Sequence, residues 1–134
     1  MPAITIRKDE FVTMLYYPES KILHHQMHKF FFGQTFRDIM NTAVDVFQKY
    51  GVQKWLADDT AVTAWTKEDQ EWGTSDWFPR ALKSGWKYWA IRMPQNTLGQ
   101  LAVRRVAEKY STHGIQTKTF STVDEAQKWL ESCK

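Results

Sequence analysis

Two short apolar runs decide the fold of this chain: KWLA at residues 54–57 and YWAI at residues 88–91. Each run ends in an abrupt change of character, to Asp58-Asp59 after the first and to Met93-Pro94 soon after the second. Short runs of consecutive apolar residues, without the alternation of a half-exposed strand, are typical of strands buried on both faces of a parallel sheet. Helix-forming residues lie between them, so the pattern predicts two parallel strands joined by a helical crossover.

The residues before the first run predict an antiparallel hairpin. Segments 11–17 and 22–32 are extended in character, and Pro18-Glu19-Ser20 between them favours a turn. A shorter alternating segment, residues 4–6, precedes the hairpin. Such a start predicts a mixed sheet with an antiparallel edge.

A helix is predicted from Thr35 to Tyr50, because apolar residues recur there at three- and four-residue spacing. Thr35 and Asp38 have the spacing of a capping box, and Gly51 supplies the left-handed stop. The helix is expected to pack on the sheet, and the predicted core is Trp55, Leu56, Ala57, Tyr88, Ala90 and Ile91 of the strands with Phe36, Met40, Val44 and Phe47 of the helix.

The crossover between the two runs predicts a helix in two pieces. Thr66 and Asp69 form a second capping box, which starts a helix through Trp72. Gly73-Thr74-Ser75 is expected to interrupt it, and Ser75 or Asp76 to cap a second piece that stops at Gly85.

The last third of the chain alternates again. Asn96 is predicted to cap a helix that runs to about Tyr110, and segment 115–120 alternates as a strand. Ser121 or Thr122 then caps a final helix. The expected inward residues of the first of these helices are Leu98, Leu101, Ala102, Val106 and Tyr110. The whole pattern predicts one α/β domain over residues 1–134, with a hairpin followed by the order α-β-α-β-α-β-α.

Composition excludes several classes of function. The net charge is +3, and its 18 basic and 15 acidic residues are interspersed, so no nucleic-acid partner is expected. Cys133 is the only cysteine, which excludes an internal disulfide. Together with an N-terminus that lacks signal-peptide character, this predicts a cytoplasmic protein. The apolar runs are too short for a transmembrane segment.

Asp58 and Asp59 are the first candidate site residues, because ligands of open α/β sheets bind near the carboxyl ends of parallel strands. The two acids could bind a cation, orient a substrate hydroxyl or act as acid and base. The alternative is that one caps the following loop and the other is solvated. No catalytic or phosphate-binding motif accompanies them.

The aromatic content of 15%, with seven tryptophans, is the second signal. Trp55 and Trp89 are expected in the core, whereas Trp65, Trp72 and Trp77 belong to the loop and the interrupted helix. These three could form a lid over an apolar pocket, with Asn96 nearby, or simply be buried. If they form a lid, part of their surface should reach solvent.

Three histidines, His24, His25 and His28, form a third candidate. On a strand His24 and His28 share one face and His25 points to the other. A metal site is the less favoured interpretation, because no cysteine or carboxylate cluster accompanies them. The sequence therefore predicts no metal and no cofactor.

The element order resembles the SpoIIAA-like branch of the STAS superfamily, from about residue 16 to residue 130. The matching segments are YYPE (16–19), KWLADD (54–59), ED (68–69) with EW (71–72), WFPRA (77–81) and GWKYWA (85–90). The resemblance implies a mixed sheet of four to five strands with packed helices, in a small bacterial cytoplasmic protein. Related folds serve as anti-sigma-factor antagonists, transporter tails and lipid-binding modules, so fold alone does not select a function.

One departure from the family pattern concerns phosphorylation. Phosphoswitching members of the superfamily carry a Ser followed by Gly at a helix start where this chain has Thr66 followed by Lys67, Glu68 and Asp69. A phosphate there would face two carboxylates, so no phosphorylation switch is expected.

The sequence therefore predicts a non-enzymatic binding or regulatory domain with a protein partner. The alternative is a carrier or sensor of an apolar small molecule or lipid. A second copy of the chain is a further candidate partner. The predicted ligand-binding residues are Asp58, Asp59, Trp65, Trp72, Trp77 and Asn96.

Overall fold

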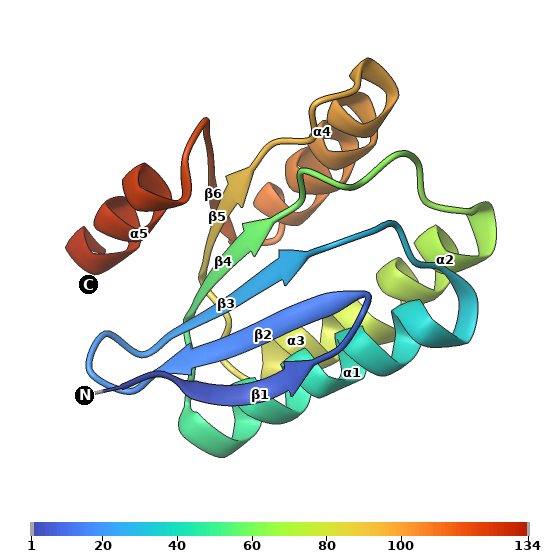
Figure 1. The fold of residues 1–134 in the computed structure, drawn as a ribbon. Coiled ribbons are helices and arrows are strands. Elements are labelled where there is room, and N and C mark those ends of the chain that lie inside the picture. Colours follow the sequence, from blue (N-terminus) through green and yellow to red (C-terminus); the bar gives the residue numbers. More distant parts are fainter. Residues whose placement is uncertain (1, 134) are drawn as a thin grey trace.

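A computed structural model describes residues 2–133 of the chain as a mixed sheet with helices on both faces (Figure 1). In chain order the elements are β1 Ile4–Lys8, β2 Val12–Tyr17, β3 Ile22–Met27, α1 Gly33–Tyr50, β4 Lys54–Asp58, α2 Lys67–Trp72, the π-helical segment η1 Gly73–Trp77, α3 Phe78–Lys83, β5 Tyr88–Arg92, α4 Thr97–Ser111, β6 Gln116–Phe120 and α5 Val123–Ser132.

The sheet has the strand order β1-β2-β3-β4-β5-β6 within the described residues. Strands β1, β2 and β3 pair antiparallel, and β3 to β6 pair parallel. The predicted α/β class, the N-terminal hairpin and the helix–strand alternation after it are confirmed. The six strands exceed the four to five that the resemblance implies, because β1 adds an outer strand to the hairpin.

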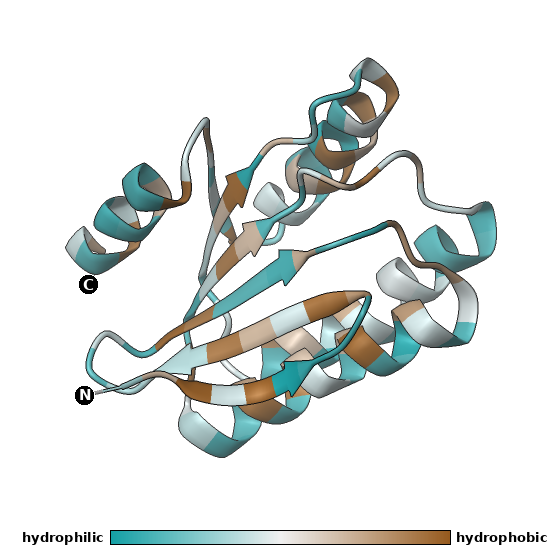
Figure 2. Cartoon of the chain, viewed as in Figure 1, coloured by the Kyte–Doolittle hydropathy of each residue, from teal (hydrophilic) through white to brown (hydrophobic). Residues whose placement is uncertain are grey.

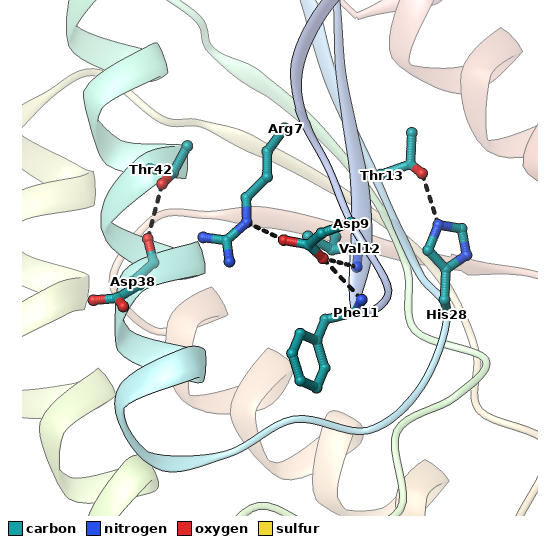
Figure 3. Close-up of polar contacts among 8 residues, drawn as sticks. All are labelled: Arg7, Asp9, Phe11, Val12, Thr13, His28, Asp38 and Thr42. Carbon is teal, nitrogen blue, oxygen red and sulfur yellow. Dashed lines mark hydrogen bonds and ion pairs between the residues drawn. The ribbon is translucent and has the colours of Figure 1, made fainter.

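The turn that joins β1 to β2 is held by one carboxylate (Figure 3). Asp9 accepts hydrogen bonds from the backbone N–H groups of Phe11 and Val12 through Oδ1, and from the Arg7 guanidinium through Oδ2 at 2.7 Å. This Asx-type bonding explains why a charged segment makes a tight turn. His28, the residue after β3, is hydrogen-bonded to Thr13 of β2.

Successive parallel strands in this order place their crossover helices on one face, because each crossover has the same hand. On that face, one cluster of buried hydrophobic side chains joins the sheet to α1, α2–η1–α3 and α4. Helix α5 covers the opposite face (Figure 1), where Ala126 and Leu130 belong to a second cluster with Leu56 and Ala90. Burial on both faces explains the continuous buried runs of β4 and β5, whose arrows contain brown segments in Figure 2.

The predicted core is confirmed except for one residue. All six strand positions are buried, as are Phe36, Val44 and Phe47, whereas Met40 is only partly buried. Ala90 lies against Ala126 of α5, as expected of a small residue that lets a helix approach. Trp55 and Trp89 are core residues, as predicted.

The start of α1 differs from the prediction. The helix begins at Gly33, with the apolar residue Phe32 at the N-cap, so Thr35 lies inside the first turn and the predicted capping box is wrong. The Gly33 N–H instead donates to the Asp69 carboxylate of α2 at 3.0 Å. A side chain 36 residues away in the sequence thus satisfies one of the free N–H groups at the start of this helix, in place of a local capping residue.

The crossover helix also differs. The segment from Lys67 to Lys83 is helical throughout, with η1 as a widened turn in place of the predicted break. Ser75 and Asp76 therefore cap nothing, and the Ser75 hydroxyl donates to the Glu71 carbonyl. Such π-helical turns are frequent at functional sites.

Helix α4 is rotated relative to the prediction. Its buried residues are Gly99, Val103, Ala107 and, as predicted, Tyr110, and Val106 is partly buried against the core, whereas Leu98 and Leu101 are 69% and 45% exposed. A methyl group on Gly99 would lie 2.3 Å from the Val62 carbonyl oxygen, so the helix backbone packs directly on the loop after β4. This contact turns Gly99 inward and Leu98 outward.

Thr66 provides a direct test of helix capping. Its hydroxyl oxygen accepts from the Asp69 N–H at 3.1 Å, as the sequence predicts. Thr66→Ala should lower the free energy of unfolding by about 1 kcal/mol, because one N–H of the first turn loses its acceptor. Urea unfolding measures the change. Thr66→Ser, which keeps the hydroxyl, should remain within about 0.5 kcal/mol of the wild type, and equal losses in both variants would contradict the capping role.

Candidate functional site

A cavity of about 530 Å³ lies at the helix-rich face of the sheet. This volume is within the range of small-molecule sites, roughly 300–1,000 Å³. Its lining comes from β3 to β5 (His25, Met27, Trp55, Asp59, Trp89), from α1 and the residues before it (Phe31, Phe36, Ile39, Met40), from the crossover (Trp65, Lys67, Asp69, Gln70, Glu71, Gly73, Thr74, Ser75, Trp77) and from α4 (Arg105, Val106, Lys109, Tyr110).

The three candidate tryptophans of the crossover have different environments. Trp77 is fully buried, lines the cavity and donates its indole N–H to the Met40 carbonyl at 2.7 Å. Trp65 lines the cavity and is half-buried. The predicted partial exposure therefore holds for Trp65 but is wrong for Trp77.

Trp72 is half-buried but does not line the cavity. Its ring packs edge-on against Phe36 and lies beneath the guanidinium groups of Arg37 and Arg80. It secures α2 to α1, so Trp65, and not Trp72, is the half-buried crossover indole whose removal is expected to affect binding more than folding.

The adjacent acids Asp58 and Asp59 serve opposite faces of the sheet. Asp59 lines the cavity, and its carboxylate is 3.0 Å from His25 Nε2. Asp58, which ends β4, instead accepts from Arg92 at 3.2 Å and from the Thr60 hydroxyl at 2.9 Å. Because side chains alternate along a strand, two neighbouring acids cannot both enter one pocket here. The expectation that both lie at its polar end is corrected.

Asn96 also lies outside the cavity lining. Its side chain caps α4 by accepting from the Gly99 N–H at 2.6 Å, as predicted, and donates to the Val62 carbonyl at 2.8 Å. Both hydrogen bonds fix the start of α4 to the loop after β4. Its role is to position one wall of the cavity.

His25 is a cavity residue that the sequence offered only as a disfavoured metal ligand and not among the predicted ligand-binding residues. Both His25 and Asp59 are buried, so their hydrogen bond is shielded from water. The alternation of side chains along the strand correctly placed His25 on the opposite face from His24. Its partner Asp59 is 34 residues away in the sequence, so the strand pattern could not reveal this contact. Within residues 2–133 no group of three or more His, Cys, Asp or Glu side chains is placed to hold a metal ion.

Several buried polar atoms of residues that line the cavity have no hydrogen-bond partner in the described part of the chain. They are the indole nitrogens of Trp55, Trp65 and Trp89 and the Nδ1 atom of His25. Buried donors are nearly always satisfied in native proteins, so unpaired donors at a cavity require an explanation. Hydrogen bonding to a ligand is one.

Comparison of the chain with protein-family models, curated proteins and solved structures gave no match. The site must therefore be interpreted from its own chemistry. No helix within residues 2–133 combines the length and apolar character that crossing a bilayer requires.

His24 points away from the cavity and is hydrogen-bonded to the Tyr17 hydroxyl at 2.9 Å. Burial lowers the pKa of His24 from 6.5 to about 4; the nearby His25 lowers it further, and Asp58 partly opposes both effects. His24 is therefore neutral at pH 7, and protonating it disfavours the folded state.

The depressed pKa of His24 predicts a pH dependence of stability. The unfolded chain takes up this proton more readily, so the contribution of neutral His24 is complete above pH 6.5 and is lost as the pH falls to about 4. The loss should reach at most about 3 kcal/mol, because one pKa unit corresponds to about 1.4 kcal/mol and the ring is only partly buried.

Urea unfolding of the wild type and of His24→Gln at pH 7 and pH 4.5 measures this contribution. The carboxylates titrate in both proteins, so the difference between their pH dependences isolates His24. The variant should lose less stability on acidification than the wild type. Identical pH dependences would show that His24 does not have a depressed pKa.

Proposed function

We propose that this protein is a non-enzymatic domain that binds an apolar or aromatic small molecule in the cavity beneath α2 and η1. The observation that carries the proposal is the lining itself, in which aromatic and aliphatic side chains surround the buried His25–Asp59 pair. Small-molecule sites typically combine apolar walls with a few polar groups that fix the ligand's orientation.

The unpaired indole N–H groups of Trp55, Trp65 and Trp89 support the same function. A ligand with hydrogen-bond acceptors would satisfy them, and its body would cover the exposed part of Trp65. Burying that surface contributes roughly 25 cal/mol per Å² to binding. The proposal thus favours a carrier or sensor over a domain that acts only through its outer surface.

Titration with N-phenyl-1-naphthylamine, a neutral aromatic probe, tests the proposal. Probe fluorescence should rise on binding, and indole fluorescence should be quenched. Met40→Trp, which adds volume at the cavity wall, should weaken binding by at least about tenfold, or about 1.4 kcal/mol. Leu101→Trp is the matched control, because it adds the same indole at an exposed position that does not line the cavity.

Three results would count against the proposal: no binding by the wild type, equal loss in Met40→Trp and Leu101→Trp, or unchanged affinity in Met40→Trp. Native mass spectrometry of the purified protein provides a second measurement. A retained small molecule in the wild type that is absent from Met40→Trp would support a carrier function.

Protein binding is the second candidate function, favoured by the exposed Leu98 and Leu101 on one side of α4. Adjacent exposed leucines are typical of protein contact surfaces. The simplest partner is a second copy of the chain. Sedimentation velocity should then show a dimer that Leu98→Ser/Leu101→Ser converts to a monomer; a monomeric wild type at high concentration would exclude self-association through this surface.

A further inference from the structure

Basic and acidic side chains lie at different places on the cavity wall, which the binding of a purely apolar ligand does not require. Two exposed cations of α4, Arg105 and Lys109, lie one helical turn apart on its wall, and neither forms an ion pair within residues 2–133. Lys109 Nζ donates to the Thr74 hydroxyl of η1 at 3.3 Å, so the ammonium group spans the space between the two helices. Because both side chains are exposed and line the cavity, we call Arg105 and Lys109 its rim.

Of the three acidic residues that line the cavity, Asp59 and Asp69 are buried and have partners, whereas Glu71 is exposed and lies 3.9 Å from the Lys67 ammonium group, so these two opposite charges offset each other. Asp59 contacts His25, and Asp69 accepts from the Gly33 N–H at the start of α1. These carboxylates would repel an anion placed beside them, whereas the two rim cations would attract one. The charges therefore favour an anionic group at α4 over one beside the sheet.

Between these two ends the lining includes two tryptophans whose hydrogen-bond donors are buried and unpaired. Trp55 and Trp89 lie on the sheet side of the cavity, and their indole N–H groups have no acceptor within the described residues. An indole N–H can only donate. A ligand body with an acceptor atom, such as an ether or carbonyl oxygen, suits these donors better than a pure hydrocarbon.

We propose that the ligand is an amphiphilic carboxylate, whose apolar body fills the cavity and whose carboxylate binds Arg105 and Lys109 at the rim. This inference rests on the proposed small-molecule function and specifies its ligand class. Arg105 provides the planar guanidinium that binds a carboxylate with two hydrogen bonds, and Lys109 adds a second charge.

The test compares ligands that share a body and differ in charge. Binding of 1-naphthaleneacetate and of the neutral 1-naphthaleneacetamide is measured by calorimetry, and decanoate and decanamide form a second pair with an aliphatic body. Each carboxylate should bind about tenfold more tightly than its amide at low salt, because charge-assisted hydrogen bonds are about twice as strong as neutral ones. Raising the salt concentration should reduce the difference.

Arg105→Gln and Lys109→Gln should lower the affinity for the carboxylate much more than the affinity for the amide, and so remove most of the preference for the carboxylate. Arg104→Gln is the matched control, since Arg104 is exposed on the same helix but does not line the cavity. Thermal unfolding of all three variants verifies that they fold, as expected of substitutions at exposed positions.

The outcomes separate this inference from the function on which it rests. If amides and carboxylates bind the wild type equally, or if Arg104→Gln has the same effect as Arg105→Gln, the carboxylate assignment is overturned and small-molecule binding stands. If no member of either pair binds and N-phenyl-1-naphthylamine also fails to bind, both are overturned. Preference for the decanoate pair over the naphthalene pair would identify the body as aliphatic.

Discussion

Trp77→Ala should lower the free energy of unfolding by about 3–5 kcal/mol, the range observed when a buried aromatic side chain is removed. Trp77 is fully buried, and its ring lies 5.5 Å from both Trp55 and Trp86 between centroids. The substitution removes these contacts and the hydrogen bond to the Met40 carbonyl, and it leaves a void beside the existing cavity. Urea unfolding monitored by circular dichroism measures the loss.

Two further variants show how much of the stability lost in Trp77→Ala comes from packing and how specific the loss is to Trp77. Trp77→Phe keeps most of the packing and should lose less than Trp77→Ala, because a single hydrogen bond contributes about 1 kcal/mol. Trp65→Ala, at a half-buried position on the cavity, should lose less stability than Trp77→Ala but more affinity for N-phenyl-1-naphthylamine. A loss below about 1 kcal/mol for Trp77→Ala would contradict full burial of this indole.

Phe47→Ala should also cost about 3–5 kcal/mol. Phe47 is fully buried on the side of α1 that faces the sheet, where its ring packs edge-on against Trp55 at 5.6 Å and stacks with Trp86 at 5.9 Å. Its carbonyl accepts from the Gly51 and Val52 N–H groups, which end the helix. A void at this position loosens both the helix end and the aromatic core.

The neighbouring residue supplies the control for Phe47. Gln48 is exposed, so Gln48→Ala should change stability by no more than about 0.5 kcal/mol. Phe47→Leu, which retains much of the buried volume, should lose less than Phe47→Ala. Equal unfolding midpoints for Phe47→Ala and Gln48→Ala would mean that the wrong face of α1 had been assigned to the core.

Much of the fold could be predicted because its signals are local. The apolar runs at 54–57 and 88–91 identify the central parallel strands, and Thr66 and Asn96 cap their helices as expected. Gly51 adopts the left-handed conformation, with φ of 64°, that ends α1. Each signal depends on side-chain period or on contacts within a few residues, and such interactions act before the chain is compact.

The errors arose where distant residues replaced local ones. The Asp69 carboxylate accepts from the Gly33 N–H at the start of α1, where the sequence predicted a local cap at Thr35. The packing of Gly99 on Val62 rotates α4 so that Leu98 faces outward. The predicted break at residues 73–75 became a π-helical turn, in which Gly73 is buried close to the Tyr110 hydroxyl. Local propensity is weak, so tertiary contacts override it.

By itself, the sequence determined which segments are strands and helices, the composition of the core and the surplus of tryptophan that indicates a pocket. Only the tertiary structure decided that Asp59 and not Asp58 enters the cavity, that His25 is its partner, and that Trp65 and Trp77 line it while Trp72 does not. Strand and helix periods specify the two faces of an element, but a cavity is formed by residues from several elements. Which of those residues meet depends on packing between segments far apart in the chain.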